Sequence, residues 1–314
     1  MQTVILDMDP GVDDALAIML ALRSPELKVL GISIVNGNVP LEKGTRNALR
    51  VLGFLGRGDI PVYPGAGRPT VRDPIYATNV HGPEGMGEAA LPDPGTAPAG
   101  DGVEFLVEMI STHPEEITLI ATGPLTNLAL AEERFPGILS RVHRLIVMGG
   151  AIHEPGNITP VAEFNFYVDP HAARRVVQSG APLTLVTLDA THRVGLDMET
   201  MRERIIPLKT PTAQFITAAL RTWISFGERL YGRAVIHLHD PVAVGVVIDP
   251  SLFAFASTFL DVETEGHLTV GQVVTDRRPF IRERDRLYYK VGYAADVDSR
   301  GFIEMFLKRV LKEA

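Results

Sequence analysis

The stretch ILDMDPGVDDALAIMLALRSP, residues 5–25, places four aspartates between an apolar strand and an apolar helix. The aliphatic residues before the first aspartate favour a buried strand, and the apolar run after the last one is typical of a buried helix. Pro10 and Gly11 turn the chain between them, which puts Asp13 and Asp14 in the first helical turn. A strand, a tight turn and a helix in this order begin a βαβ unit, so the stretch predicts a parallel sheet.

The same alternation of short apolar runs and longer helical patterns continues along the chain. Further strand-like runs are KVLGISIV, ITLIAT, HRLIVMG and PLTLVTL, and further helical patterns are LEKGTRNALRVLGFLG and LTNLALAEERF. We predict an α/β fold with a single open, mainly parallel, Rossmann-like sheet flanked by helices. Towards the carboxyl end we expect helices near 212–231, 241–248 and 300–312 and a few additional antiparallel strands. Residues 1–314 show no domain linker and are expected to form one domain.

Composition excludes several classes of protein. The chain is 46% hydrophobic and 22% charged, which is typical of a globular protein. Its net charge of −8 and the lack of a Lys/Arg cluster argue against nucleic-acid binding. No run approaches the ~20 apolar residues of a spanning helix, and the start MQTVILDMDP is no signal peptide, so we expect a cytoplasmic protein without a membrane partner. Because the chain has no cysteine, any metal must bind through oxygen or imidazole.

Polar residues follow four of the predicted strands. In parallel α/β sheets, ligands bind outside the carboxyl ends of the strands, where the chain turns into the next helix. We therefore expect these strand ends to meet at one site. The residues concerned are Asp7, Asp9, Asn36, Asn38, Thr122 and Met148 with the two glycines after it.

The aspartate cluster indicates a metal site. One or two acidic residues in a first helical turn are explained by the helix dipole alone. Four carboxylates beside an apolar core would be costly to ionise unless a cation is bound among them. Oxygen ligands without cysteine favour Ca²⁺ or Mg²⁺ over zinc, and carboxylates with a backbone carbonyl suit the larger, less demanding Ca²⁺.

A long Pro/Gly-rich connection spans residues 67–101. It is too long to be a simple turn, so it is either a functional lid or a disordered segment. We favour the lid.

DMDPGVDDALAI resembles the amino-terminal signature of the nucleoside hydrolases, calcium-dependent α/β enzymes that split nucleosides into ribose and free base. The first strand and its DxD would also suit an aspartyl phosphohydrolase, but the likeness to nucleoside hydrolases continues through five further motifs in order. These motifs are VNGN (35–38), HGPEGMG (81–87), ATGPLTNLAL (121–130), VMGGAIHEPGNITPVAEFNFYVDPHAA (147–173) and HDPVAV (239–244).

The resemblance implies a set of calcium ligands and a general base. The implied ligands are Asp9, Asp14, Asp240 and the carbonyl of Thr122. From the residues alone, Asp240 before Pro241 is also a good helix N-cap. The implied base is Asp13, which would accept a proton from a metal-bound water that attacks the anomeric carbon. We expect Asp7 to contact and orient the metal ligands without binding the metal itself.

The resemblance also implies residues that bind the substrate. Ribose hydroxyls would contact the calcium and the side chains of Asn38, Asn157, Glu163 and Asn165. Glu163 and Asn165 are two apart, so an extended chain would place them on one face. Taken singly, each of these polar residues could instead satisfy loop backbone.

Three further residues are implied around the base and the sugar. His239 would protonate or hydrogen-bond the leaving base, and His81 would cover it. Met148 would line the sugar face, although core packing explains it nearly as well. We interpret His237 as structural or peripheral.

His239 and a single tryptophan are similar to the histidine-containing branch, which includes inosine-uridine-preferring and pyrimidine-preferring enzymes. Side chains of the 212–231 helix would choose the base, with Trp223, Phe226, Arg229 and Tyr231 as candidates. The resemblance implies a ribonucleoside substrate, a role in nucleoside catabolism and salvage, and a homo-oligomer, either tetramer or dimer. The preferred base stays open.

Three hypotheses therefore remain. The first is a Ca²⁺-dependent ribonucleoside hydrolase acting on inosine, uridine or cytidine. The second is a Mg²⁺-dependent aspartyl phosphohydrolase with Asp7 or Asp9 as nucleophile, for which we find no suitably placed lysine. The third is a non-catalytic nucleoside or ribose binder on the same fold, which would have no need of Asp13.

Overall fold

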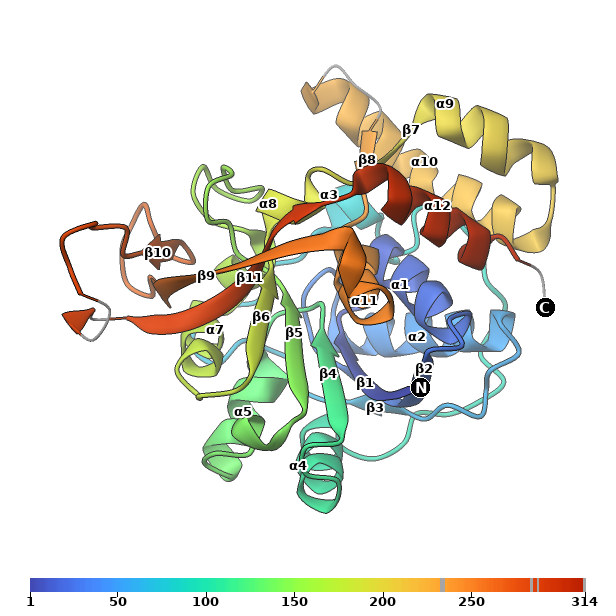
Figure 1. Ribbon diagram of the computed structural model, residues 1–314. Helices are drawn as coiled ribbons and strands as arrows, with labels where there is room; N and C mark the ends of the chain where they lie inside the picture. Colours follow the sequence, from blue (N-terminus) through green and yellow to red (C-terminus); the bar gives the residue numbers. More distant parts are fainter. Residues whose placement is uncertain (232–234, 283–284, 287, 313–314) are drawn as a thin grey trace.

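The computed structural model describes residues 1–231, 235–282, 285–286 and 288–312 (Figure 1). Its centre is a nine-stranded sheet in which seven neighbouring strands, from β3 to β11, pair in parallel. β9 and β10 extend one edge in antiparallel fashion. In spatial order the strands are β10 (Val273–Thr275), β9 (Phe253–Val262), β11 (Tyr289–Val297), β6 (Leu183–Val186), β5 (Arg144–Met148), β4 (Ile117–Ala121), β1 (Gln2–Met8), β2 (Leu27–Ile34) and β3 (Val62–Pro64).

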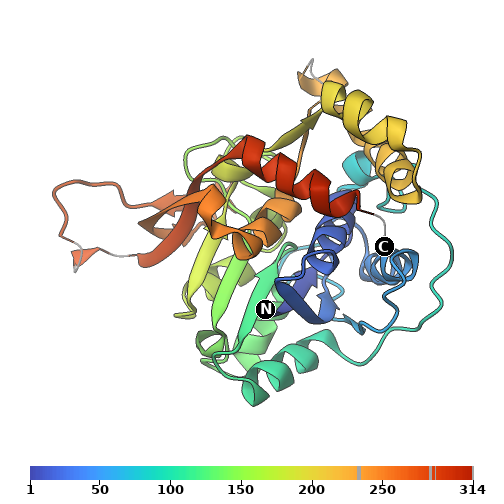
Figure 2. The ribbon, with the colours of Figure 1, turned by 45° about the vertical axis from the view of Figure 1, so that its right-hand side comes forward.

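Helices cover both faces of this sheet, as its side-chain alternation requires. Along β1, Val4 and Leu6 pack into one buried apolar cluster, whereas Ile5 between them packs into the other. The first cluster is covered by α1 (Val12–Leu22), α2 (Leu41–Phe54), α10 (Pro211–Tyr231), α11 (His239–Ile248) and α12 (Ser299–Val310). The second is covered by α4 (Gly102–Thr112), α5 (Thr126–Arg134) and α7 (Pro170–Val177) (Figures 1 and 2). The predicted fold class is thus confirmed.

The shorter elements lie mostly in connections. β7 (Gly195–Asp197) and β8 (Val235–His237) form a separate antiparallel pair. None of the described helices combines the length and the apolar character needed to cross a membrane. The short helices and turns are α3 (Thr78–His81), α6 (Phe164–Val168), α8 (Leu188–Thr191), α9 (Met198–Thr200), η1 (Leu139–Arg141), η2 (Met201–Ile205), η3 (Ile206–Leu208) and η4 (Pro250–Leu252).

The strand order reverses direction at β1. From β1 the chain moves outward to β2 and β3, and it then returns to place β4 on the opposite side of β1. Such a switch point is where open α/β sheets bind ligands. The register pairs Asp7 with Ala121, so the next residues of the two strands, including Asp9 and Thr122, emerge side by side.

The connection from 67 to 101 contains α3 and is otherwise irregular. Its middle part brings His81 to the carboxyl edge of the sheet, where the ring nitrogen Nδ1 lies 3.9 Å from Asp13. The following residues run along the outside of the molecule towards α4 (Figure 2). Only part of this connection therefore has the position that a lid over the strand ends would need.

Candidate active site

Four aspartates from three elements meet at the switch point. Asp9 directly follows β1, Asp13 and Asp14 open α1, and Asp240 lies in the first turn of α11. All four are buried, and Asp13, Asp14 and Asp240 offer carboxylate oxygens that lie within 4.8 Å of one another. The amino termini of two helices also face this cluster, and their dipoles favour negative charge there.

Polar neighbours satisfy only part of the cluster. The Asn38 backbone N–H donates to Asp9 Oδ2 (2.7 Å), and the Asn38 side-chain amide donates to Asp14 Oδ2 (3.1 Å). Asp14 also accepts from the Gly11 N–H (2.8 Å) and from the Thr122 hydroxyl (3.1 Å). Asp9 Oδ1 and Asp13 Oδ1 are buried, and no donor from the described residues reaches them. Buried acceptors of this kind ordinarily have a partner.

The electrostatics of the cluster favour a bound cation. Burial, with the charge of Asp14, raises the pKa of Asp13 to about 8. Burial also raises the pKa of Asp9 and of Asp240 well above the usual range, with further contributions from the neighbouring carboxylates. Without a cation, burial and the mutual repulsion of the carboxylates would favour their protonated forms. Two buried carboxylate oxygens lack a hydrogen-bond donor among the described residues, and the carboxylates lie close together. An all-oxygen set of this kind fits a hard divalent cation such as Ca²⁺ or Mg²⁺.

Asn165 joins the ends of β4 and β5. Its amide nitrogen donates to the carbonyls of Thr122 (2.7 Å) and Met148 (3.2 Å) and lies 3.5 Å from the Met148 sulfur. Asn165 and Met148 are both buried beside the cluster. The implied metal-ligand carbonyl of Thr122 thus accepts one hydrogen bond already, and a carbonyl oxygen has a second lone pair.

Glu163 is placed differently from the prediction. Residues 164–168 form the helix α6, so the expectation that Glu163 and Asn165 share one face of an extended chain is wrong. Glu163 is instead the N-cap of α6 and accepts from the backbone N–H groups of Asn165, Phe166 and Gly150. Burial raises the pKa of Glu163 while these three hydrogen bonds oppose the rise.

Asn157 is not brought into the cluster. It is exposed on the loop before α6, and its side-chain oxygen accepts from the Phe164 N–H (2.9 Å). Asp7 also points elsewhere, since its carboxylate accepts from Ser33 (2.5 Å) and Asn127 (2.8 Å). Burial raises the pKa of Asp7 to about 7. Asp7 therefore ties β1 to its neighbours and does not hydrogen-bond the other aspartates.

His81 reaches the cluster from α3. The Val12 N–H donates to His81 Nδ1 (3.1 Å), which leaves the ring proton on Nε2 in the neutral form. Burial lowers the pKa of His81 to about 3. The Trp223 ring from α10 lies 5.4 Å from the imidazole, centroid to centroid. The other candidate base contacts, Phe226, Arg229 and Tyr231, have side chains outside the described part of the chain.

His239 opens α11 next to Asp240 and is half-buried. The α11 helix begins with Leu238 as N-cap, so the alternative that Asp240 caps it is wrong. His239 Nδ1 lies 2.8 Å from the Thr191 hydroxyl. Two more histidines lie near it. The ring centroid of His239 is 5.8 Å from that of His192 and 6.1 Å from that of His237.

Burial and the neighbouring histidines keep His239 uncharged. Burial first, and then the nearby His192, His237 and His81, hold the pKa of His239 well below its usual range. Sequence reasoning missed His192 and interpreted His237 as peripheral. The available signal was the polar sequence THR after the strand-like run PLTLVTL, because it follows one more parallel strand at the same edge.

Carboxylates suited to a cation, buried amides and histidines thus meet at one switch point of a mainly parallel sheet, an arrangement that fits a metal-dependent hydrolase. Residues 4–304 match the family described as inosine-uridine preferring nucleoside hydrolase, and the chain belongs to this family. It is 39% identical over 315 residues to the pyrimidine-specific ribonucleoside hydrolase RihA of Escherichia coli O7:K1, a match that covers 98% of this chain and 97% of that protein.

Solved structures agree with this assignment. The fold matches a purine-preferring ribonucleoside hydrolase from Gardnerella vaginalis with a TM-score of 0.91 and 32% identity over 98% of both chains. It matches a plant nucleoside hydrolase with a TM-score of 0.88 and 32% identity over 99% of both chains. The protein is thus an enzyme of the glycosidase type that acts on nucleosides, which argues against both the phosphohydrolase and the non-catalytic binder.

Proposed function

We propose that the protein is a Ca²⁺-dependent ribonucleoside hydrolase that cleaves the N-glycosidic bond of inosine, uridine or cytidine to give ribose and free base. The observation that carries this proposal is the buried set of Asp13, Asp14 and Asp240, whose oxygens lie within 4.8 Å of one another. Beside them, Asp9 Oδ1 has no hydrogen-bond donor among the described residues. Assembly as a dimer or tetramer and a cytoplasmic location stay predictions.

Asp9, Asp14, Asp240 and the carbonyl of Thr122 would hold the ion. When bound, Ca²⁺ would offset the charge of the cluster, bind ribose hydroxyls and lower the pKa of a coordinated water. The bonds from Asn38, Gly11 and Thr122 fix two of these carboxylates in place before any ligand arrives. Such fixed ligands lose little conformational freedom on binding.

Asp13 would act as the general base. It lies in the same cluster, yet one of its oxygens has no donor from the described residues and is therefore free to accept a proton. Its pKa of about 8 without a cation would fall when positive charge is nearby, towards the range in which a base works at neutral pH. Asp13 would take the proton of the attacking water as the bond between sugar and base breaks.

The ribose would lie between the aspartates and the amides of Asn38 and Asn165. Glycosidic cleavage develops positive charge on the sugar, and negative groups close to it stabilise that charge. Glu163 would supply a further buried carboxylate, whose ionised form three backbone N–H groups favour against the effect of burial. Met148 would line the sugar face, and Asn157 would contact the ribose only if its surface loop moved inward.

The leaving base would face the two histidines. His239 has its Nδ1 turned to Thr191, so Nε2 is the nitrogen available to the base. Because its pKa is held low, His239 would act as a hydrogen-bond donor to the base in the neutral form. Protonation of the base would require the imidazolium form, which this low pKa disfavours. His81, with its proton on Nε2, would cover the base from the other side.

The experiment is a panel assay. Release of reducing sugar is measured from inosine, adenosine, guanosine, uridine and cytidine, before and after a calcium chelator, with calcium or magnesium added back. We expect release from inosine, uridine or cytidine that the chelator abolishes and calcium restores. Full activity in chelator, or restoration by magnesium alone, would contradict the calcium proposal, and no release from any nucleoside would contradict the hydrolase.

A further inference from the structure

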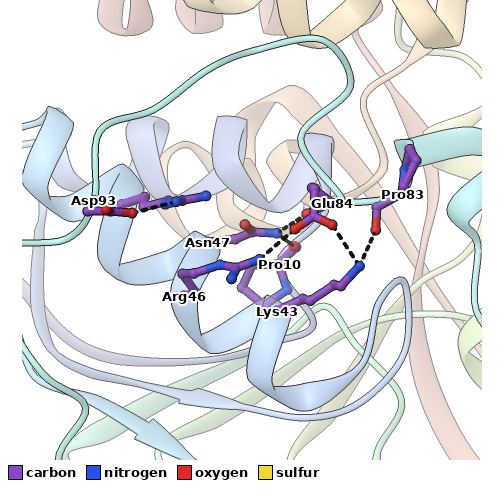
Figure 3. A network of polar contacts seen from close by, with 8 residues as sticks. Pro10, Lys43, Arg46, Asn47, Pro83, Glu84 and Asp93 are labelled. Atoms are coloured by element: carbon purple, nitrogen blue, oxygen red, sulfur yellow. Dashed lines mark hydrogen bonds and ion pairs between the residues drawn. The ribbon is translucent and has the colours of Figure 1, made fainter.

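One buried amide joins two parts of the site that lie far apart in sequence. Asn47, fully buried in α2, donates from Nδ2 to the Pro10 carbonyl (3.1 Å) and to the Glu84 carbonyl (2.7 Å) (Figure 3). Pro10 belongs to the aspartate turn, residues 9–14, which supplies Asp9, Asp13 and Asp14. Glu84 belongs to the His81 segment, residues 81–87. A single side chain thus connects the turn that would hold the cation with the segment that would cover the base.

The chemistry of this link suits asparagine. An amide NH₂ has two hydrogens and can serve two carbonyl acceptors at once. Aspartate would place a third oxygen against the carbonyls of Pro10 and Glu84, and leucine would leave both without this donor. The Asn47 oxygen has no partner among the described residues, so the two carbonyls alone fix the orientation of the amide.

The two segments also touch directly. The Val12 N–H from the aspartate turn donates to His81, and a Cβ on Gly11 would lie 2.7 Å from the His81 Nδ1. Gly85 has φ +82°, and a Cβ there would lie 2.9 Å from Asn47 Nδ2. Glycine at both positions therefore permits an approach that a side chain would block.

A second set of contacts lies outside Asn47 and is exposed. Glu84 pairs with Lys43 (2.8 Å) and Arg46 (2.5 Å), and Arg50 pairs with Asp93 (2.7 Å) (Figure 3). Ion pairs that face solvent contribute little, because water and salt screen them. The buried link through Asn47 is therefore the one expected to hold the His81 segment in register with the aspartate turn.

We propose that Asn47 is a positioning residue that couples cation binding at the aspartate turn to recognition of the leaving base by the His81 segment. This inference rests on the proposed function for its two ligands. Coupling of this kind is reciprocal, so the cation improves the placement of His81 and a bound base improves the retention of the cation.

The chain has its own reporter for this coupling. Trp223 is the single tryptophan, is buried, and lies 5.4 Å from His81. When calcium is titrated into metal-free protein, tryptophan emission should change and saturate together with calcium binding measured by calorimetry. In Asn47→Leu, calcium should still bind, within about tenfold of the native affinity, but without the emission change. Arg46→Ala, which removes an exposed contact of the same network, is the matched control and should respond like the native protein.

Kinetics separate positioning from a general loss of structure. Asn47→Leu should lower kcat/KM for a nucleoside at least about tenfold, and lower it less than about threefold for 4-nitrophenyl riboside, whose leaving group needs little help from the protein. A merely structural defect would lower both to the same extent. If Asn47→Leu does not fold, Asn47→Ser keeps one hydroxyl donor and should show the same ratio to a lesser degree.

Three results would overturn the proposal. They are a native emission response in Asn47→Leu, an equal loss on both substrates, and an emission of the native protein that does not respond to calcium. If the native protein hydrolyses no nucleoside but its calcium response depends on Asn47, coupling between the cation and the His81 segment is supported, whereas the proposed function, and with it the role towards the base, fails.

Discussion

The carboxylate end and the histidine end of the site respond to burial in opposite directions. Burial raises the pKa of Asp9, Asp13 and Asp240, whereas it lowers the pKa of His81 and His239. Both shifts favour the uncharged form. At the acidic end a divalent cation can reverse the shift, because it makes four neighbouring carboxylates favourable in their ionised form. At the histidine end no such partner is needed, since a neutral imidazole already donates a hydrogen bond.

The two ends also differ in how they are held. Backbone N–H groups, an amide and a hydroxyl from three strand ends fix Asp9 and Asp14. His239 contacts the Thr191 hydroxyl and lies near the rings of His192, which follows α8, and His237, at the end of β8. A charged centre of this kind depends on ligands that are fixed in place, whereas the leaving-group side depends on neutral hydrogen-bond donors.

The strongest test of the acidic end is Asp13→Asn. The amide keeps the shape of Asp13 but cannot accept the proton of the attacking water, so kcat should fall by about 10²–10⁴-fold. Calcium should still bind, because Asp9, Asp14 and Asp240 remain. Asp240→Asn is the matched control, because it replaces a proposed calcium ligand. Its main effect should be weaker calcium binding. A native kcat in Asp13→Asn, or loss of calcium binding in it, would contradict the assignment.

Metal removal should make stability depend on pH. The pKa of Asp13 is about 8 in the folded protein without a cation and about 4 in an unfolded chain. Between these values the folded state holds a proton that the unfolded state has released. The contribution of Asp13 to stability is therefore fully present below about pH 4 and is lost as pH rises through about 8. Bound calcium keeps the carboxylates ionised and should remove this loss.

Thermal melts at pH 5, 6, 7 and 8 test this, each in chelator and in calcium. We expect Tm in chelator to decline with pH over this range and the gap to the calcium curve to widen. In chelator, the decline of Tm with pH should be shallower for Asp240→Asn than for the native protein, because the variant has one fewer carboxylate in the cluster. Parallel curves with and without calcium would mean that the cluster does not titrate as an empty cation site.

The strongest test of the histidine end is His239→Ala. Loss of the donor should slow inosine hydrolysis by about 10²-fold, whereas an analogue with a good leaving group should slow less than about threefold. His237→Ala is the control, because that ring is 6.1 Å away and should matter less. Equal slowing of both substrates by His239→Ala would show that His239 has no role towards the base.

Much of the fold could be predicted because its signals are local. Hydrophobic runs and the Pro10–Gly11 turn define β1 and α1 within about twenty residues, and parallel topology then brings the strand ends together. Three members of the aspartate cluster, Asp9, Asp13 and Asp14, follow from the same stretch, since only a cation makes so many buried carboxylates favourable. Asp240 comes from α11, far along the chain, and is assigned through the family resemblance.

The remaining features depend on contacts that are distant in sequence. Glu163, the N-cap of α6, also accepts a hydrogen bond from the Gly150 N–H, thirteen residues earlier. Asn47 has partners 37 residues away on either side, and in its own helix it has the sequence pattern of any buried polar residue. Thr191 contacts His239 across 48 residues. No periodicity or motif within α2 or α6 could have indicated these partners.

The smallest effect is expected for His192→Asn, which tests what keeps His239 neutral. His192 is the first neighbour, after burial itself, that lowers the pKa of His239, so His192→Asn should move that pKa upward. Turnover of inosine at pH 8 should change less than about threefold, because His239 would remain neutral there. NMR titration of the His239 ring in calcium-loaded protein measures the shift, and His153→Asn, an exposed histidine, is the control. An unchanged or lower pKa of His239 in His192→Asn would mean that the neutrality of this end depends on burial alone and not on the group of histidines.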